Sequence, residues 1–235
     1  MVKFVIKSKK TGKKVELSPI HETMLDFVQY CREDIKKHAM IIGMPRHGKS
    51  AIIVDPYPLY EWGIYGTNRQ IKVVCGDEGL VKVRVDTARD YVEGKYGFEY
   101  NLTFPHVKRD KSHPWRQRYF YLERDVSGDP SFWGHPVLGT GEGSGCQVII
   151  FDDPVTKTNA VKNPKLQEQV IKAIEGTWLP RLDPPDAFAI YICNAWTSVD
   201  ATAHIKKNRL DAWCILELGV ADDYSGIEQR VYGDV

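Results

Sequence analysis

The sequence predicts an α/β fold in which a mostly parallel central sheet is flanked by helices. Three observations support this class. Predicted strands alternate with helical segments along the chain. Two continuous apolar runs, at 148–151 and 188–193, are typical of strands buried on both faces. The octapeptide at 43–50, Gly-Met-Pro-Arg-His-Gly-Lys-Ser, fits the phosphate-loop template G-x-x-x-x-G-K-[ST] and lies between two apolar runs, which is the strand–loop–helix context of that template.

Hydrophobic periodicity, capping residues and turn signals locate the individual elements. Ser18 and Pro19 are the residue types preferred at an N-cap and at the first helical position. Pro56 and Pro58 are expected to end or kink the helix that begins at Lys49. The other predicted helices span residues 18–37, 80–96, 163–179 and 199–207. Strands are predicted at 2–6, 15–17, 39–42, 71–75, 119–122, 148–151, 188–193 and 213–218, and the irregular stretch 98–145 is expected to cross the surface.

Composition indicates a single globular domain. The chain has 235 residues, of which 43% are apolar and 27% charged. We expect N-terminal strands within 1–18 and the phosphate-loop core within 19–220. The net charge of +1 means that any nucleic-acid surface must be a local patch. No apolar run approaches the length of a membrane span, and the first residues lack a signal-peptide stretch, so neither a membrane partner nor secretion is expected.

The cysteines indicate a reducing compartment. There are five, an odd number, and no two have the C-x-x-C spacing. This pattern predicts neither a disulfide framework nor a zinc site. We therefore expect a cytoplasmic protein.

The octapeptide predicts a site for a nucleoside triphosphate and Mg²⁺. Gly43 and Gly48 let the backbone turn its N–H groups toward phosphates, and the following helix N-terminus adds partial positive charge. Lys49 is expected to reach the β- and γ-phosphates and Ser50 to ligate Mg²⁺. The residues expected to contact the nucleotide are Gly43, Met44, Pro45, Arg46, His47, Gly48, Lys49, Ser50 and Ala51.

Two polar strand ends complete the predicted site. The strand at 148–151 leads into Asp152, the expected second ligand on the Mg²⁺ side, and Asp153, expected to position or polarise the attacking water. Asn194 follows the strand at 188–193. Its amide has both a donor and an acceptor, which suits a contact with the γ-phosphate or the water, but an Asn that begins a turn explains the sequence equally well.

These motifs together resemble the large terminase subunit of tailed bacteriophages, from about Pro19 to Ile205. The Pro-Arg-His-Gly-Lys-Ser at 45–50 is similar to the family's phosphate loop. The Gly-Ser-Gly at 143–145 running into Val-Ile-Ile-Phe-Asp-Asp-Pro at 148–154 is similar to its glycine-rich approach to the acidic strand end. Asn-Ala-Trp at 194–196 lies where the family has its coupling motif, and Pro-Ile-His-Glu at 19–22 resembles its adenine-side motif.

The resemblance implies an additional-strand, RecA-like ATPase core. It implies that Mg-ATP hydrolysis is coupled to translocation of double-stranded DNA into a procapsid, by a virus-encoded protein in the host cytoplasm. The implied partners are a portal protein, a small terminase subunit and further copies of the chain in a ring on the portal. The resemblance also assigns a γ-phosphate contact to Arg46, an adenine-side role to His21, and catalytic roles to Lys49, Asp153 and Asn194.

Several positions depart from the family pattern. Ser144 occupies a position that often carries an arginine acting on a neighbour's ATP, so such an arginine is expected elsewhere, for example at Arg116, Arg118 or Arg124. Asn194 replaces the usual Thr of the coupling motif, and Asp153 stands where many packaging ATPases have Glu. The family's C-terminal nuclease domain is not in this sequence. We expect residues 221–235 to be a tail or linker toward it, and no nuclease activity from this chain.

Other interpretations stay open at this stage. A different phosphate-loop ATPase, such as a helicase or recombinase core, has the same basic motifs. A nucleotide-binding assembly module with weak hydrolysis is the non-motor alternative, which the changes at Ser144 and Asn194 favour. The basic and aromatic stretch at 108–118 suits contact with phosphates or with a neighbouring subunit, and equally a solvated loop.

Overall fold

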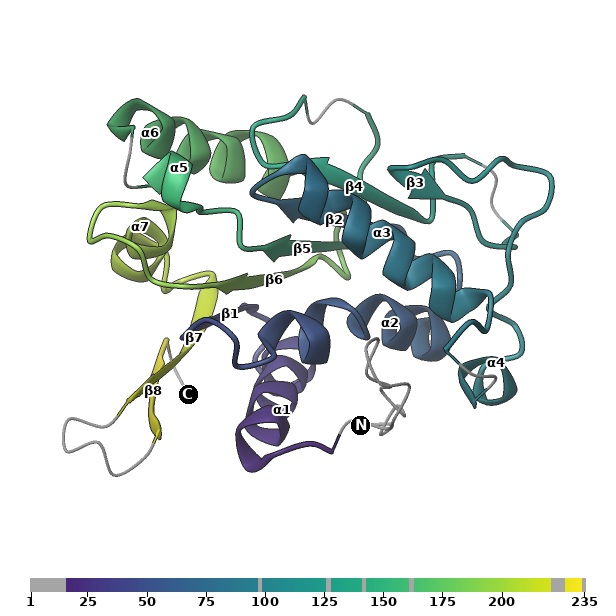
Figure 1. Ribbon diagram of the computed structural model, residues 1–235, viewed down its shortest axis with the longest axis horizontal. Coiled ribbons are helices and arrows are strands. Elements are labelled where there is room, and N and C mark those ends of the chain that lie inside the picture. The colour runs from purple at the N-terminus through teal and green to yellow at the C-terminus, as the bar shows by residue number, and fades with distance from the viewer. Residues whose placement is uncertain are drawn as a thin grey trace.

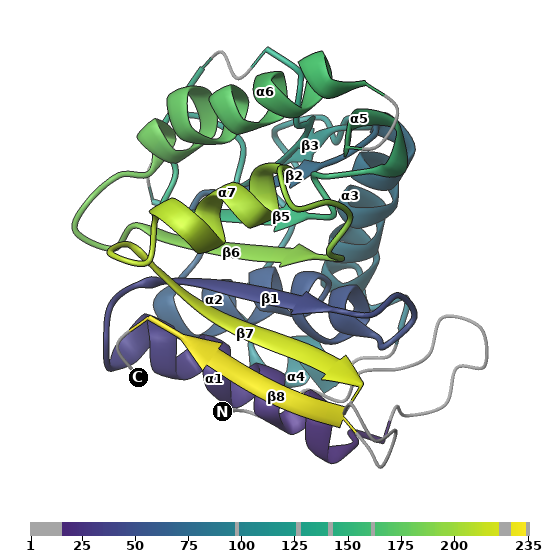
Figure 2. The same cartoon turned by 90° about the vertical axis from the view of Figure 1, so that its left-hand side faces the viewer.

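The chain folds into an eight-stranded sheet between two layers of helices (Figures 1 and 2). The computed structural model describes residues 16–96, 99–125, 128–140, 143–160, 163–220 and 227–233. The strands are β1 (His38–Gly43), β2 (Ile71–Cys75), β3 (Tyr119–Phe120), β4 (Phe132–Pro136), β5 (Val148–Asp152), β6 (Phe188–Cys193), β7 (Trp213–Val220) and β8 (Ile227–Tyr232). This architecture confirms the predicted α/β class.

The α-helices lie before β1 and in connections between successive strands. They are α1 (Pro19–Glu33), α2 (Tyr57–Tyr65), α3 (Glu78–Val92), α4 (Glu99–Thr103), α5 (Lys157–Ala160), α6 (Pro164–Ala173) and α7 (Ala201–Asn208). A π-helix, η1 (Ser50–Val54), follows the phosphate loop. A second π-helix, η2 (Ile174–Trp178), and a 3₁₀ turn, η3 (Leu179–Arg181), extend α6.

The sheet order is β3-β4-β2-β5-β6-β1-β7-β8. The pairs among β4, β2, β5, β6, β1 and β7 are parallel, and only the edge strands β3 and β8 pair antiparallel. Strand β6 lies between β1 and β5. The carboxyl ends of these three strands therefore meet at one edge, where ligands bind in open parallel sheets.

Alternation of side chains along the strands produces two cores. In β1, Ala39 and Ile41 belong to the core shared with α1, η1, α2 and α3, whereas Met40 and Ile42 belong to the core shared with α6, η2 and α7. Figure 2 shows these helical layers on opposite sides of the sheet. Because both faces are covered, the central strands are apolar at nearly every position, as the sequence indicated.

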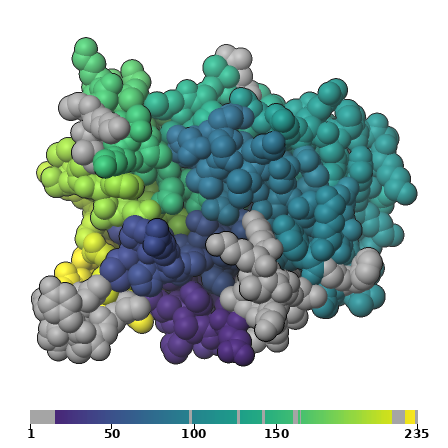
Figure 3. Space-filling view, viewed as in Figure 1, coloured from purple at the N-terminus to yellow at the C-terminus, as the bar shows by residue number. Residues whose placement is uncertain are grey.

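The structure differs from the predictions where an element depends on its neighbours. Residues 227–232 are not a tail, because β8 pairs with β7 from Val220↔Ile227 to Ile215↔Tyr232. The stretch 98–145 contains α4, β3 and β4 and forms one end of the molecule beside α3 (Figure 3). The helix after the phosphate loop stops before Pro56, as expected, but α2 then begins with Pro58 in its first turn.

Smaller differences concern element ends. The first helix ends at Glu33 rather than at 37, and α3 begins two residues before the predicted start and ends at Val92. The predicted strand at 2–6 and residue 15 lie outside the described residues. Glu16 and Leu17 are not part of a strand. These differences leave the sheet edge that carries the site unchanged.

Gly134 in β4 allows α3 to approach the sheet closely. A Cβ at this position would lie 2.6 Å from Val81 Cγ1 and 2.9 Å from Val85 Cγ2. We expect Gly134→Ala to lower the free energy of unfolding, measured with denaturant, by about 1–3 kcal/mol. Gly176→Ala is the matched control, because its Cβ would meet nothing within 4 Å. Equal stability of the two variants would contradict this account of the packing.

Candidate nucleotide-binding site

The loop at 43–50, which fits the phosphate-loop template, connects the end of β1 to η1 and has two left-handed residues. Arg46 has φ 69° and Gly48 has φ 72°. At Gly48 a Cβ would also lie 3.2 Å from His21 Nε2, so glycine suits this position for two reasons. The loop thus turns back over the carboxyl end of β1, with the N-terminus of η1 behind it.

His21, on α1, contacts the loop at 43–50. Its Nδ1 accepts a hydrogen bond from the Ser18 backbone N–H at 3.2 Å, as part of the box that caps α1. Nε2 therefore carries the proton and donates to the carbonyl of His47 at 3.3 Å. This places His21 beside the loop, and its contact with adenine stays a prediction.

Lys49 is buried at the centre of the site. Its ammonium donates to the carbonyls of Gly43 at 2.9 Å and Met44 at 2.7 Å, and to Asn194 Oδ1 at 2.9 Å. Burial lowers the pKa of Lys49, and the nearby carboxylates of Asp153 and Asp152 oppose that shift. All three ammonium protons thus point to oxygen acceptors.

Asn194 joins the two sides of the site. Its Oδ1 accepts from Lys49, while its Nδ2 donates to Asp153 Oδ1 at 3.0 Å. This bridge is possible because Asn194 follows β6, the strand between β1 and β5. The geometry therefore favours a role in the site over the alternative that Asn194 only begins a turn.

Asp153 has an unusual backbone and a perturbed carboxyl. Its φ is 44°, in the left-handed region. Its carbonyl lies against Gly76, where a Cβ would approach to 2.5 Å, so the chain after β2 must carry glycine here. Burial, with a contribution from the neighbouring Asp152, raises the pKa of Asp153 to about 6. A pKa near the working pH suits a group that exchanges a proton with water.

Asp152 is fully buried and has a partner on each oxygen. Ser50 Oγ donates to Oδ1 at 2.7 Å, and Arg84 Nε on α3 donates to Oδ2 at 2.5 Å. Arg84 Nη1 also donates to Asp55 Oδ1 at 2.9 Å. Burial alone would lower the pKa of Arg84, but the charges of Asp152 and Asp55 outweigh it and raise that pKa.

Arg84 and Asp55 were not predicted as site residues. The available signal was the position of Arg84 in α3, three residues after Val81 and four residues before Ala88, both of which are buried. An arginine within the apolar stripe of a helix needs a buried partner. The sequence does not say which carboxylate supplies it.

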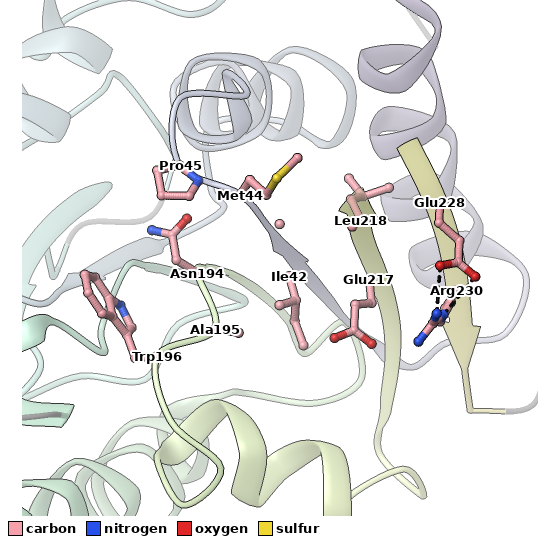
Figure 4. A pocket seen from close by; sticks show the side chains of 12 residues that line it. Ile42, Met44, Pro45, Asn194, Ala195, Trp196, Glu217, Leu218, Glu228 and Arg230 are labelled. Atoms are coloured by element: carbon pink, nitrogen blue, oxygen red, sulfur yellow. Dashed lines mark hydrogen bonds and ion pairs between the residues drawn. The ribbon is translucent and has the colours of Figure 1, made fainter. Parts of the chain in front are cut away.

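The remaining predicted residues lie around this centre. The Arg46 side chain and Ala51 are exposed. Met44 and Pro45 line a pocket of about 390 Å³ at the carboxyl ends of β1, β6 and β7, which Asn194 also lines (Figure 4). The contact of Arg46 with a γ-phosphate stays a prediction.

Ser144 and residues of the basic stretch at 108–118 have partners within the chain. The carbonyl of Ser144 accepts from Lys72 Nζ at 2.5 Å. Arg118 is paired with Glu78 Oε1 at 2.6 Å, on the exposed start of α3. In the stretch 108–118, Arg109 lies over the ring of Trp115 at 4.5 Å. These contacts organise the segment without assigning it to DNA or to a neighbouring subunit.

The donor set fits a divalent cation with bound phosphates. Ser50 Oγ and the Asp152 carboxylate are hard oxygen donors close together, as Mg²⁺ prefers. Lys49 and the backbone of the loop provide positive charge and N–H groups beside them. Among the described residues, no three His, Cys, Asp or Glu side chains gather as a metal-binding cluster.

Comparison with known proteins places this geometry in a known fold. No protein-family model matches the sequence, and no curated protein matches it. Among solved structures, the HK97 bacteriophage large terminase aligns with a TM-score of 0.60 and 14% identity, over 93% of this chain. The chain has the fold of that terminase. The alignment covers 42% of the terminase chain, so this chain spans less than half of its length.

A second structure, the bacteriophage Phi-29 viral genome packaging motor assembly, aligns with a TM-score of 0.49 and 16% identity. The alignment covers 84% of this chain and 54% of the chain in that assembly. Within the part of the chain that the structure describes, no helix is long and apolar enough to span a bilayer.

The raised pKa of Asp153 predicts a pH-dependent stability. An unfolded Asp ionises near 3.8 and the folded group near about 6. Between these pH values the folded state binds more protons, so the free energy of unfolding falls as pH rises. Asp153→Asn lacks this effect. We expect the stability of the variant relative to the wild type, without cation or nucleotide, to increase by on the order of 1–2 kcal/mol from pH 4 to pH 7.

Denaturant unfolding of both proteins at several pH values measures this difference. Titration of carboxyl groups distant from Asp153 cancels between the two proteins. A stability difference that stays constant from pH 4 to pH 7 would contradict the raised pKa of Asp153.

Proposed function

We propose that this chain is an ATP-hydrolysing motor domain of a viral DNA-packaging machine. One observation carries the proposal: Lys49, Asn194 and Asp153 form a continuous hydrogen-bonded chain, beside the Ser50–Asp152 pair, at the carboxyl edge of β1, β6 and β5. We interpret the strand between β1 and β5 as the additional strand of a RecA-like core. The fold shared with the HK97 large terminase supports the packaging role.

The loop and Lys49 would bind the phosphates of ATP. In the structure Lys49 donates to two loop carbonyls and to Asn194, and phosphate oxygens would replace some of these acceptors. Ser50 and Asp152 would hold Mg²⁺, which supplies charge neutralisation at the phosphates. Arg46, exposed on the loop, would add a planar donor to the γ-phosphate.

Asp153 would act on the attacking water, and Asn194 would respond to the loss of the γ-phosphate. The Asp153 carboxyl has a pKa near neutrality and is oriented by the Asn194 amide. Loss of the γ-phosphate would change the partners of Lys49 and therefore of Asn194. The chain Lys49–Asn194–Asp153 thus provides a physical route from the nucleotide to β6 and the residues that follow it.

We further propose that this hydrolysis drives translocation of double-stranded DNA. The partners would be a portal protein, a small terminase subunit and other copies of this chain arranged as a ring. Position 144 carries a serine instead of an arginine that could act on a neighbour's ATP. A ring of these chains would therefore use another basic residue for this role. The exposed basic stretch at 108–118 is one source.

Substitution at the site tests the hydrolytic part of the proposal. We expect Lys49→Ala to reduce phosphate release about 100-fold or more, because the charge opposite the β- and γ-phosphates is lost. Asp153→Asn should reduce turnover about 100-fold or more while the Kd for ATP changes by less than about threefold. Phosphate release and nucleotide binding are measured separately, with portal, small subunit and DNA present.

The outcomes separate the alternatives. Turnover that survives Lys49→Ala contradicts this site assignment. Tight ATP binding without phosphate release, even in the full assembly, favours a nucleotide-binding assembly module. Processive opening of a duplex by the chain favours a helicase core over a packaging motor.

A further inference from the structure

Arg84 donates a hydrogen bond to Asp152, the carboxylate that would hold the cation in the proposed site. Its guanidinium donates to Asp152 Oδ2 at 2.5 Å and to Asp55 Oδ1 at 2.9 Å. The side chains of Arg84, Asp55 and Asp152 are 13%, 7% and 0% exposed. The guanidinium therefore bridges two buried carboxylates on separate segments, the end of β5 and the residue after η1.

The carboxylates around this bridge would attract a divalent cation, whereas Arg84 itself would repel it. Arg84 pairs with Asp152 and Asp55, and the carboxylates of Asp152 and Asp153 also interact electrostatically with the Lys49 ammonium. These three carboxylates and two cations leave the group with one negative charge in excess. A dication near Asp152 would be attracted by the carboxylates and repelled by Arg84 at short range. Because the group is buried, solvent screens this repulsion weakly.

We propose that Arg84 is an internal competitor of the divalent cation for Asp152. Without a cation, the guanidinium neutralises the buried carboxylate. When the cation binds with nucleotide, Arg84 shifts its interaction toward Asp55, which accepts from the same guanidinium. The inference rests on the proposed Mg-nucleotide site, and it adds a positioning residue on α3 to that site.

The exchange would link the cation to the position of α3. Arg84 is a direct polar connection from α3 to β5 and to the end of η1. Arg89, farther along the same helix, lies over Trp115 at 5.3 Å and donates to the carbonyl of Arg116. Helix α3 thus contacts the acidic end of β5 through Arg84 and the basic stretch at 108–118 through Arg89.

Nucleotide binding with and without cation tests the competition. The Kd of the fluorescent analogue mant-ATP is measured in excess Mg²⁺ and in EDTA, and the ratio of Kd in EDTA to Kd in Mg²⁺ reports the contribution of the cation. We expect Arg84→Gln to raise this ratio on the order of tenfold, since the repelling charge is gone. Asp55→Asn should lower the ratio, because Arg84 then has only Asp152 as its carboxylate partner.

Two further variants serve as controls. Arg84→Lys keeps the charge and should leave the ratio closer to the wild type than Arg84→Gln does. Arg209→Gln removes the same charge from an ion pair with Glu175, near the opposite end of the sheet where β7 begins, and should leave the ratio unchanged. If Arg84→Gln folds poorly, Arg84→Met replaces it, because it also removes the charge and should raise the ratio. A fall of the ratio in Asp55→Asn supports the inference only together with that rise, because Asp55→Asn also removes a carboxylate that attracts the cation.

Thermal unfolding gives an independent readout. Arg84→Gln leaves two buried carboxylates without this partner, so its midpoint in EDTA should fall and its gain on addition of millimolar Mg²⁺ should exceed that of the wild type. A ratio that stays constant or falls in Arg84→Gln overturns the inference while wild-type binding still supports the nucleotide site. Absence of nucleotide binding by the wild type overturns both.

Discussion

A fully buried carboxylate at the end of β5 is the constraint on which the rest of the site depends. An ionised group in this position is strongly unfavourable unless each oxygen has a partner. Ser50 supplies one partner from the start of η1, and Arg84 supplies the other from α3. Satisfying Asp152 therefore fixes the phosphate loop, η1 and α3 relative to the sheet, and the proposed cation site is built from the same contacts.

The position of β6 between β1 and β5 has a similar consequence. A residue after β6 is within reach of both the loop after β1 and the acidic end of β5. Asn194 uses its two amide atoms in this way, accepting from Lys49 and donating to Asp153. One side chain thus connects the group proposed to bind the γ-phosphate with the group proposed to act on water.

Several elements escaped prediction for identifiable reasons. Strand β4 contains Gly134, His135 and Pro136, which have weak strand preference, and it forms because β2 and β3 pair with it and α3 covers it. Strand β8 has three consecutive polar residues, at 228–230, and no polar–apolar alternation over its six positions, and it is stabilised by pairing with β7. In both cases long-range pairing decides the structure, and a local sequence window does not contain it.

The sequence by itself determined the fold class, the central strands and the residues of the phosphate loop and the acidic strand end. These features depend on local periodicity, glycine conformation and residue chemistry, all of which are readable along the chain. Only the tertiary structure decided what Asn194 touches, that Arg84 lies against Asp152 and Asp55, and that burial shifts the pKa of Asp153. Each of these depends on strand order and on the burial of charge, which bring together residues distant in the sequence.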